Sequence, residues 1–329
     1  MTLRTAPPRL SEVQSPVRGR LDRVVDEIRR IVVSDFAPVE EVNLYLTKIR
    51  GKLFRPGLVL LCDEMAGRPS PQAETLAAIV ELVHLATLVH DDAVDHSVLR
   101  RGMPTVNAVW SHQVAIIMGD YLYTRSLMEI TRLGQLEPIR VLADAANAMT
   151  VGEMRQLSSH DALSFSEADY FRLIDAKTGS LMAAACELGA LSGAPEHRVE
   201  LRRYGAELGR AFQIADDLLD YTADAAVIGK PSGLDLREHK VTLPLIAALP
   251  RLSGAERAEV DALFRDPEPT DEAIAEVVGI VRARGGLDYA RDAAQRCAQH
   301  AADALEGLPR CPALEALRDS IAYAVERSR

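Results

Sequence analysis

The chain has 329 residues, of which 48% are hydrophobic and 26% are charged, values usual for a globular protein. Its formal net charge of −10 excludes a general basic surface for nucleic acid or an anionic membrane, so an anionic ligand needs local cations or metal ions. The four cysteines show neither paired metal-ligand spacing nor a disulfide framework. We therefore expect a cytoplasmic protein that binds no nucleic acid.

The N-terminal segment, residues 1–20, is rich in proline and arginine and lacks the apolar stretch of a signal peptide. We expect a flexible tail there. No later stretch reaches ~18 consecutive apolar residues, so no transmembrane helix is expected.

From residue 21 to 329 the apolar pattern has the period of a helix. Apolar positions recur every three or four residues, as in the stripe Leu76, Ile79, Val80, Val83 and Thr87. Ser166 and Thr270 precede such segments and are expected N-caps. Sustained alternation of the strand kind is absent. The prediction is one all-α domain, a single large helical bundle over 21–329.

Two segments end an apolar helical run with the spacing D-D-x-x-D, and their carboxylates are Asp91, Asp92, Asp95, Asp216, Asp217 and Asp220. Within each segment the carboxylates share one side of a helix, where they repel one another. At ordinary composition two such triplets arise by chance only about 0.002 times in one chain. Mg²⁺ removes the repulsion and completes its shell with substrate phosphates. The triplets therefore predict facing helices that hold Mg²⁺ ions and a diphosphate.

Cations that could complete this site occur near helix ends and glycine-containing turns, at Arg50, Lys52, Arg55, Arg100, Arg101, Lys177, Lys230 and Lys240. His84 lies seven residues before Asp91, so two helical turns place both residues on the same face. A histidine there fits either a phosphate donor or a satisfied core residue, and both readings remain open.

Several motifs occur in a fixed order along the chain: RGKLFRP, HLATLVHDDAVDHSVLRRGMPTVN, GDYLYTR, GEMRQL, AKTGSL, FQIADDLLD and GKPSGLDLREHKVTLPLI. In these motifs the chain resembles a trans-type polyprenyl diphosphate synthase of the isoprenoid synthase superfamily, from about residue 25 to about 320. The first motif departs from the family pattern GGKRxRP at Arg50 and Leu53 but keeps Lys52 and Arg55. The resemblance implies a helical bundle of the isoprenoid synthase type with a central cavity.

The resemblance also implies a role for each matching residue. Mg²⁺, three ions with bound diphosphate, would be held by Asp91, Asp95 and Asp216, with support or water-mediated contact from Asp92, Asp217 and Asp220. Isopentenyl diphosphate would be bound by Lys52, Arg55, His84 and Arg101. The allylic diphosphate would be bound by Arg100, Lys177, Thr178, Gln213 and Lys230.

The chemistry implied is a head-to-tail condensation through an allylic carbocation. Thr178 and Gln213 would aim oxygen dipoles at the cation, and Gly179 would bend its helix and free backbone carbonyls for the same purpose. Mg²⁺ and the cations would stabilise the departing diphosphate. A proton is then lost, in our interpretation to the released diphosphate.

Chain length is expected to depend on Ala86 and Thr87, five and four positions before the first aspartate. In the family bulky aromatic residues there stop elongation early, whereas small residues also serve ordinary helix packing. The small residues favour a product of C30 or longer, with the tunnel floor near Met118, Tyr121 or Met128. Farnesyl or geranylgeranyl diphosphate is the shorter alternative.

Two other functions remain as alternatives. A terpene cyclase also ionises diphosphates but has no need of the subsite formed by Lys52, Arg55 and His84. A non-catalytic partner subunit would lend helices to another synthase, although intact aspartate triplets argue against it. The resemblance further implies a homodimer and a peripheral membrane contact for product release.

Overall fold

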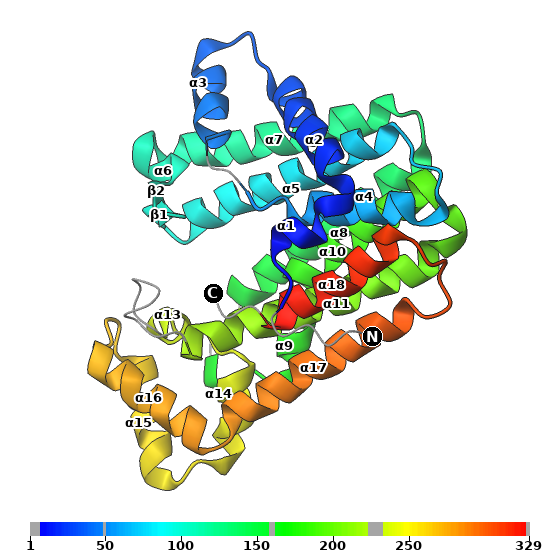
Figure 1. Cartoon of the computed structure of the whole chain (residues 1–329). Helices are drawn as coiled ribbons and strands as arrows, with labels where there is room; N and C mark the ends of the chain where they lie inside the picture. The colour runs from blue at the N-terminus through cyan, green and yellow to red at the C-terminus, as the bar shows by residue number, and fades with distance from the viewer. Residues whose placement is uncertain (1–6, 49–50, 158–161, 223–232, 327–329) are drawn as a thin grey trace.

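The computed structural model describes residues 7–48, 51–157, 162–222 and 233–326, and it confirms the all-α prediction (Figure 1). Its first half consists of α1 (Leu10–Val13), α2 (Arg18–Val32), α3 (Ala37–Leu46), α4 (Phe54–Asp63), α5 (Gln72–Val94), β1 (Leu99–Arg100), β2 (Met103–Pro104), α6 (Val106–Val109), α7 (His112–Arg132) and α8 (Leu136–Leu157). Its second half consists of α9 (Glu167–Ile174), α10 (Ser180–Gly193), α11 (Arg198–Thr222), α13 (Leu234–Arg237), α14 (Leu243–Ala248), α15 (Gly254–Arg265), α16 (Asp271–Ala283), α17 (Gly286–Ala304) and α18 (Pro312–Glu326).

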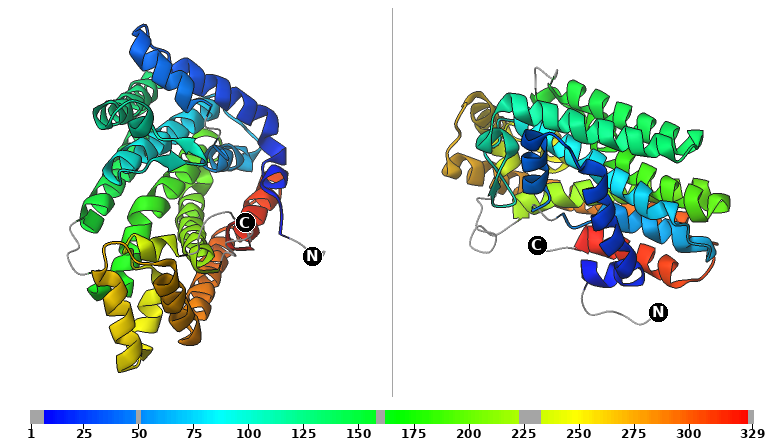
Figure 2. Two further views of the ribbon diagram at one scale, coloured as in Figure 1. Left: turned by 90° about the vertical axis from the view of Figure 1, so that its left-hand side faces the viewer. Right: turned by 90° about the horizontal axis from the view of Figure 1, so that it is seen from above.

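The helices surround one hydrophobic core that extends from Val13 to Ala324. Helix α5 packs against α2, α4, α7 and α10, while α11 packs against α10 and α17. Helices α2 and α3 lie at one end of the molecule, and α15 and α16 lie at the other (Figure 2). The expected N-caps are present, because the hydroxyl oxygens of Ser166 and Thr270 accept the backbone N–H of Asp169 and Ala273.

Among the described residues, helix α5 alone has the length and apolar composition of a membrane span. Of that stretch 56% is buried inside the bundle. The helix also carries Glu81, His84 and Asp91, which resist transfer to hydrocarbon. Its packing therefore identifies α5 as the core helix of the bundle.

The N-terminal segment corrects one expectation. The flexible tail predicted for 1–20 is wrong for residues 7–20, and residues 1–6 lie outside the described residues. Val13 and Val17 are 1% and 0% exposed, and α1 packs on α18. Pro16 is the second residue of a 3₁₀ turn, Ser15–Val17, where a missing N–H is tolerated, so this proline belongs to a helical turn and not to a disordered tail.

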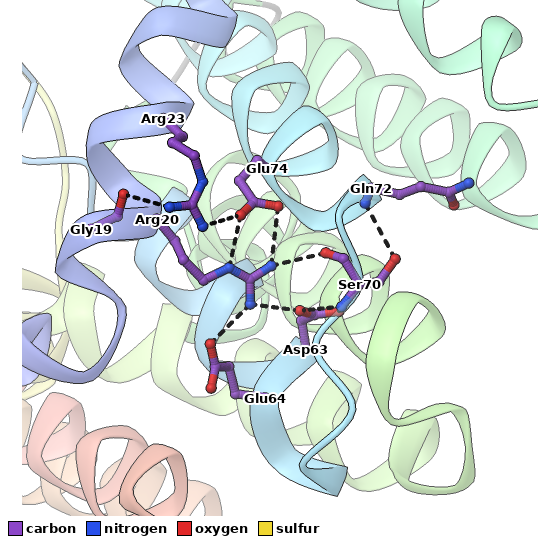
Figure 3. A network of polar contacts seen from close by, with 8 residues as sticks. All are labelled: Gly19, Arg20, Arg23, Asp63, Glu64, Ser70, Gln72 and Glu74. Carbon is purple, nitrogen blue, oxygen red and sulfur yellow. Dashed lines mark hydrogen bonds and ion pairs between the residues drawn. The ribbon is translucent and has the colours of Figure 1, made fainter.

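A buried ionic network joins α2 to the turn between α4 and α5 (Figure 3). The Arg20 guanidinium contacts Asp63 at 2.8 Å and Glu74 at 3.0 Å, and Arg23 contacts Glu74 at 2.8 Å. The Asp63 side chain is fully buried and also accepts the backbone N–H of Ser70 at 3.1 Å. Burial raises the pKa of Asp63, whereas Arg20 opposes that rise. The carboxylate therefore depends on Arg20 for compensation.

A π-helical turn, Asp175–Gly179, separates α9 from α10, so the helix is irregular where Gly179 was expected to bend it. The turn is held against α11 by a bidentate ion pair from Arg210 to Asp175, at 2.5 and 2.7 Å. Gly209 permits the close approach, because a Cβ there would lie 2.7 Å from the Gly179 Cα. The aim of the carbonyls in this turn stays a prediction.

The ionic network predicts a large stability loss on removing Arg20. Arg20→Ala leaves the Asp63 carboxylate buried without its partner, so we expect about 3 kcal/mol lower free energy of unfolding. Urea denaturation of the wild type and the variant measures this loss in the free energy of unfolding. Arg291→Ala breaks an exposed pair with Asp288 and serves as the control, with an expected loss of at most about 1 kcal/mol. Equal losses in the two variants would contradict this account.

The glycine contact predicts opposite effects at two positions. Gly209→Ala brings a methyl group onto the backbone of Gly179 and should destabilise the protein by about 1–3 kcal/mol. Gly279→Ala, in α16, meets no atom within 4 Å and should stabilise by about 0.5–1 kcal/mol through helix propensity. Thermal unfolding of both variants checks the signs, and a stabilising Gly209→Ala would refute the close contact.

Candidate active site

A cavity of about 560 Å³ lies between α2, the ends of α3 and α4, and one face of α5. Its polar lining includes Lys52, His84, Asp92, Arg100 and Arg101. The rest of the lining is mixed. Its apolar side chains come from α2, α3, α5 and α6, namely Val25, Ile28, Leu46, Leu82, Leu85, Leu88, Val89 and Val106, and further charged side chains are Asp22, Asp26 and Arg29 of α2 and Glu81 of α5. The cavity thus has a cationic region and an apolar region.

The first aspartate triplet lies in the last turn of α5. Asp92 is buried and accepts Arg100 Nε at 2.7 and 2.9 Å. Arg100 reaches back because β1 and β2 form a two-residue ribbon directly after the helix, in which Arg101 and Gly102 adopt left-handed conformations. Burial raises the pKa of Asp91 to about 6, helped by Glu153 and Asp95. Asp92 therefore positions an arginine. Burial disfavours the charged form of Asp91, and a bound cation would stabilise that charged form.

The second triplet ends α11, and two of its members are held by the protein. Asp217 accepts the Tyr170 hydroxyl at 2.5 Å and the Gln213 amide at 2.9 Å. Asp220 accepts the backbone N–H of Leu234 at 3.0 Å and that of Asp235 at 3.1 Å. These contacts give Asp217 and Asp220 positioning roles. The charge of Asp216 acts on Arg55 of α4, across the bundle.

The π turn brings three predicted residues together. Lys177 Nζ contacts Glu153 Oε2 at 2.5 Å and donates to Gln156 Oε1 at 2.9 Å, both on α8. Thr178 Oγ1 donates to Gln213 Oε1 at 2.8 Å. Lys177 is also close enough to Asp91 to oppose the rise of its pKa. Of the predicted allylic residues, Lys177 therefore lies beside the first triplet, whereas Gln213 donates to Asp217 of the second triplet and contacts Thr178.

The predicted isopentenyl diphosphate residues gather at the cavity. Lys52, His84 and Arg101 line it, and Arg55 is buried with its Nε lacking a hydrogen-bond partner. Burial, followed by Arg55 and Arg101, lowers the pKa of His84 well below its usual value. A neutral His84 that lines a cavity beside two arginines favours the phosphate-donor reading over the core reading.

Sequence reasoning missed Glu81, which lies one turn before His84. Burial raises its pKa, against the opposing charges of Arg55 and Arg101. A Cβ at Gly51 would lie 2.7 Å from Glu81 Oε1, so the glycine lets the backbone approach this carboxylate. Its place on α5, three residues before His84, was the available signal.

Asp235 was also missed as a site residue, whereas Lys240 was among the candidate cations. Burial, followed by Asp220, raises the pKa of Asp235 to about 7. The charge of Asp95 acts on Lys240 and the charge of Lys240 acts on Asp220, so this lysine lies between the two triplets. The predicted Lys230 lies outside the described residues.

The predicted chain-length positions lie on a different side of α5. Ala86 is 2% exposed, and Thr87 Oγ1 donates to the His84 carbonyl at 2.8 Å. On the neighbouring α7, Met118 is buried, which fits a tunnel floor, whereas Met128 is 49% exposed. Met128 lies on the surface of this chain, so its expected place in the floor stays a prediction.

The carboxylates fit hard cations that keep water and phosphate ligands. Among the described residues no three histidine, cysteine or acidic side chains form a ready metal cage. Mg²⁺ commonly takes one or two carboxylates and completes its shell with phosphate oxygens. Asp91 is destabilised by burial and neighbouring acids, and Lys240 lies between the triplets, so a metal–diphosphate group suits the charges present.

Comparison with known proteins finds a matching family model and similar enzymes. The family model "Polyprenyl synthetase" matches residues 37–281. An octaprenyl diphosphate synthase of Haemophilus influenzae is 35% identical over 321 residues, which cover 97% of each chain.

Solved structures give the same result. A decaprenyl diphosphate synthase from Rhodobacter capsulatus has a TM-score of 0.91 and 36% identity, over 98% of this chain and 100% of that one. A polyprenyl synthase from Caulobacter crescentus, complexed with calcium and isoprenyl diphosphate, has a TM-score of 0.91 and 33% identity, over 99% and 100%. The chain therefore belongs to the polyprenyl synthetase family, as its motifs predict.

Proposed function

We propose that this chain condenses an allylic diphosphate with isopentenyl diphosphate, giving a trans-polyprenyl diphosphate of C30 or longer. The observation that carries the proposal is the placement of cations at two locations, one beside Asp91 and one in the neighbouring cavity, with Arg100 both lining the cavity and acting on Asp91. Lys177 lies beside Asp91, whereas Lys52, His84 and Arg101 line the neighbouring cavity. Two diphosphates can thus be held at once, as condensation requires and as a terpene cyclase does not.

The chain's own residues then position the two reactants. Lys177 and Arg100 hold the allylic diphosphate while its C–O bond breaks and the electron pair leaves with the diphosphate. The oxygens of Thr178 and Gln213, which lie together at 2.8 Å, face the carbocation. Lys52, Arg55 and His84 hold isopentenyl diphosphate so that its double bond forms the new C–C bond. The proton lost from the adjacent carbon goes to the released diphosphate.

Mg²⁺ would be held by Asp91, Asp95 and Asp216, and when bound it neutralises charge on the departing diphosphate. The contacts of the other members of the triplets support their assignment as positioning residues, since Asp92 binds Arg100 and Asp220 caps α13. The Caulobacter structure with calcium and isoprenyl diphosphate supports a divalent cation and this ligand class. Three ions with bound diphosphate are proposed, as in the family.

A homodimer is part of the proposal. The outer faces of α7 and α8 expose large apolar side chains, namely Ile116, Ile117, Leu127, Met128, Val151, Met154 and Leu157. Apolar side chains gathered on neighbouring helices are typical of an interface. Light scattering of the purified chain would give its mass in solution.

The four cysteines are unpaired, which supports a reducing cytoplasm.

The proposed reaction is tested by extension assays with Mg²⁺, isopentenyl diphosphate and, in parallel, dimethylallyl, geranyl or farnesyl diphosphate. Products of C30 or longer are expected, and products that end at C15 or C20 would overturn the length while keeping the reaction. Diphosphate release without use of isopentenyl diphosphate would indicate a cyclase. A chain inactive alone would instead be a partner subunit.

Product length should respond to Ala86. Ala86→Phe places an aromatic ring one turn before the aspartates, on the side of α5 that faces the buried core. We expect products shortened to C15 or C20, measured by mass, with the consumption of the primer retained. Val33→Phe adds the same bulk at an exposed position and should leave product length unchanged. Unchanged products from Ala86→Phe would remove Ala86 from the tunnel.

The metal assignment is tested by two matched changes in α11. Asp216→Asn removes a proposed ligand and should raise the Mg²⁺ concentration for half-maximal activity by about 10- to 100-fold. Asp220→Asn keeps an oxygen acceptor for one of the two N–H groups of α13 and should change that concentration by less than about threefold. Titration of activity with Mg²⁺ gives both values, and a reversed order would exchange the two roles.

A further inference from the structure

The N-terminal segment contributes one side chain to the wall of the cavity beside α5. Gln14, the residue that follows α1, lines this cavity together with Lys52. Its backbone is anchored, because Val13 before it and Val17 after it are 1% and 0% exposed. Helix α1 packs on α18, and the 3₁₀ turn Ser15–Val17 packs on α4 and α18 (Figure 1). The Gln14 side chain therefore extends toward the cavity from a fixed position.

Both N–H groups of the Gln14 amide are bound within the protein. Its Nε2 donates to the Lys52 carbonyl and to the Leu53 carbonyl, each at 3.0 Å. A side-chain amide has only two N–H hydrogens, and its oxygen is an acceptor. No donor is left for a phosphate oxygen. Gln14 therefore lines the cavity but is unsuited to bind an anion itself.

The two carbonyls belong to a short backbone segment that is strained. Leu53 has φ 49° and ψ 36°, in the left-handed region that a leucine rarely adopts. It is the N-cap residue of α4, and its side chain makes no capping hydrogen bond. Its carbonyl accepts the backbone N–H of Gly57 at 3.0 Å in addition to the Gln14 amide. The Gln14 amide thus ties the strained residue to the residue before it.

We propose that Gln14 is a positioning residue for isopentenyl diphosphate, which fixes the backbone at Lys52 and thereby the direction of the Lys52 side chain. The inference rests on the proposed function, because that function assigns the diphosphate to Lys52. Lys52 depends on Gln14 most directly, since its own carbonyl is one of the two acceptors. Arg55 lies within α4, whose own hydrogen bonds hold its backbone.

The packing of Gln14 can be separated from its hydrogen bonds by the choice of variant. A Cβ at Gly57 would lie 3.5 Å from Gln14 Cγ, so the side chain rests on the first turn of α4. Methionine is unbranched and of similar length, so Gln14→Met keeps this contact and removes both donors. Gln14→Glu keeps the shape and places acceptor oxygens against the two carbonyl oxygens.

The first experiment measures the two Michaelis constants of the full chain with Mg²⁺ and farnesyl diphosphate as the primer. Gln14→Met should raise KM for isopentenyl diphosphate by about tenfold, because a misplaced cation no longer meets the diphosphate, and Gln14→Glu should raise it further. KM for farnesyl diphosphate should stay within about twofold, since Lys177 is held by Glu153 and Gln156 of α8.

The matched control is Gln299→Met, which removes an exposed amide hydrogen bond to Asp303 in α17. It should leave both KM values unchanged. Calorimetric titration with isopentenyl diphosphate alone repeats the comparison without turnover, and the affinity of Gln14→Met should be about tenfold weaker than that of the wild type.

The second experiment asks whether Gln14 acts through Lys52. Lys52→Ala removes the cation that Gln14 is proposed to position. Adding Gln14→Met to Lys52→Ala should therefore lower kcat/KM for isopentenyl diphosphate by less than about twofold further, whereas the same change in the wild type lowers it by about tenfold. Equal losses in the two backgrounds would overturn the inference.

Two other results would also overturn it. One is an unchanged KM for isopentenyl diphosphate in both Gln14 variants. The other is a rise of both KM values together with a lower Tm, which would show a structural role alone. The proposed function fails separately, when the wild-type chain extends no primer with isopentenyl diphosphate.

Discussion

The structure depends on one electrostatic constraint, which is the placement of six carboxylates at the ends of two largely buried helices. Like charges so close together raise one another's pKa and resist burial. Three of the carboxylates are paired within the protein. Asp92 binds Arg100, Asp217 accepts from Tyr170 and Gln213, and Asp220 accepts from the backbone of α13. These three carboxylates therefore position neighbouring groups of the site. The rest of the repulsion is what a metal–diphosphate group would relieve.

The same constraint explains the surroundings of the site. The two triplets can bind a metal–diphosphate group only if cations approach it from fixed directions. Irregular segments of the backbone place the cations in these directions. The π turn presents Lys177 and Thr178, and the ribbon after α5 returns Arg100 to Asp92. Gly51 and Gly209 allow backbone approaches that a side chain would block. Regular helices form the scaffold of the bundle, and the π turn and the ribbon after α5 place the cations of the site.

Sequence patterns predicted the helical bundle and most of the site because both leave periodic or repeated marks. Apolar spacing marks α5, and the repeated D-D-x-x-D spacing marks both triplets. Glu81 and Asp235 were missed because a single buried acid has no spacing partner. The tail at 7–20 was mistaken because a proline there belongs to a helical turn, while Val13 and Val17 carry the burial. Product length depends on the depth of a tunnel, which local sequence does not encode.

Helix α5 carries His84, proposed to bind isopentenyl diphosphate, Asp91, proposed to bind metal, and Ala86, proposed to limit product length, and all of them share one register. A single residue inserted between Glu81 and Asp91 would rotate the aspartates by about 100° relative to Glu81, which lines the cavity. Every function of the helix would then be lost together, although each side chain would still be present. The length of this segment is therefore as much a part of the active site as its residues.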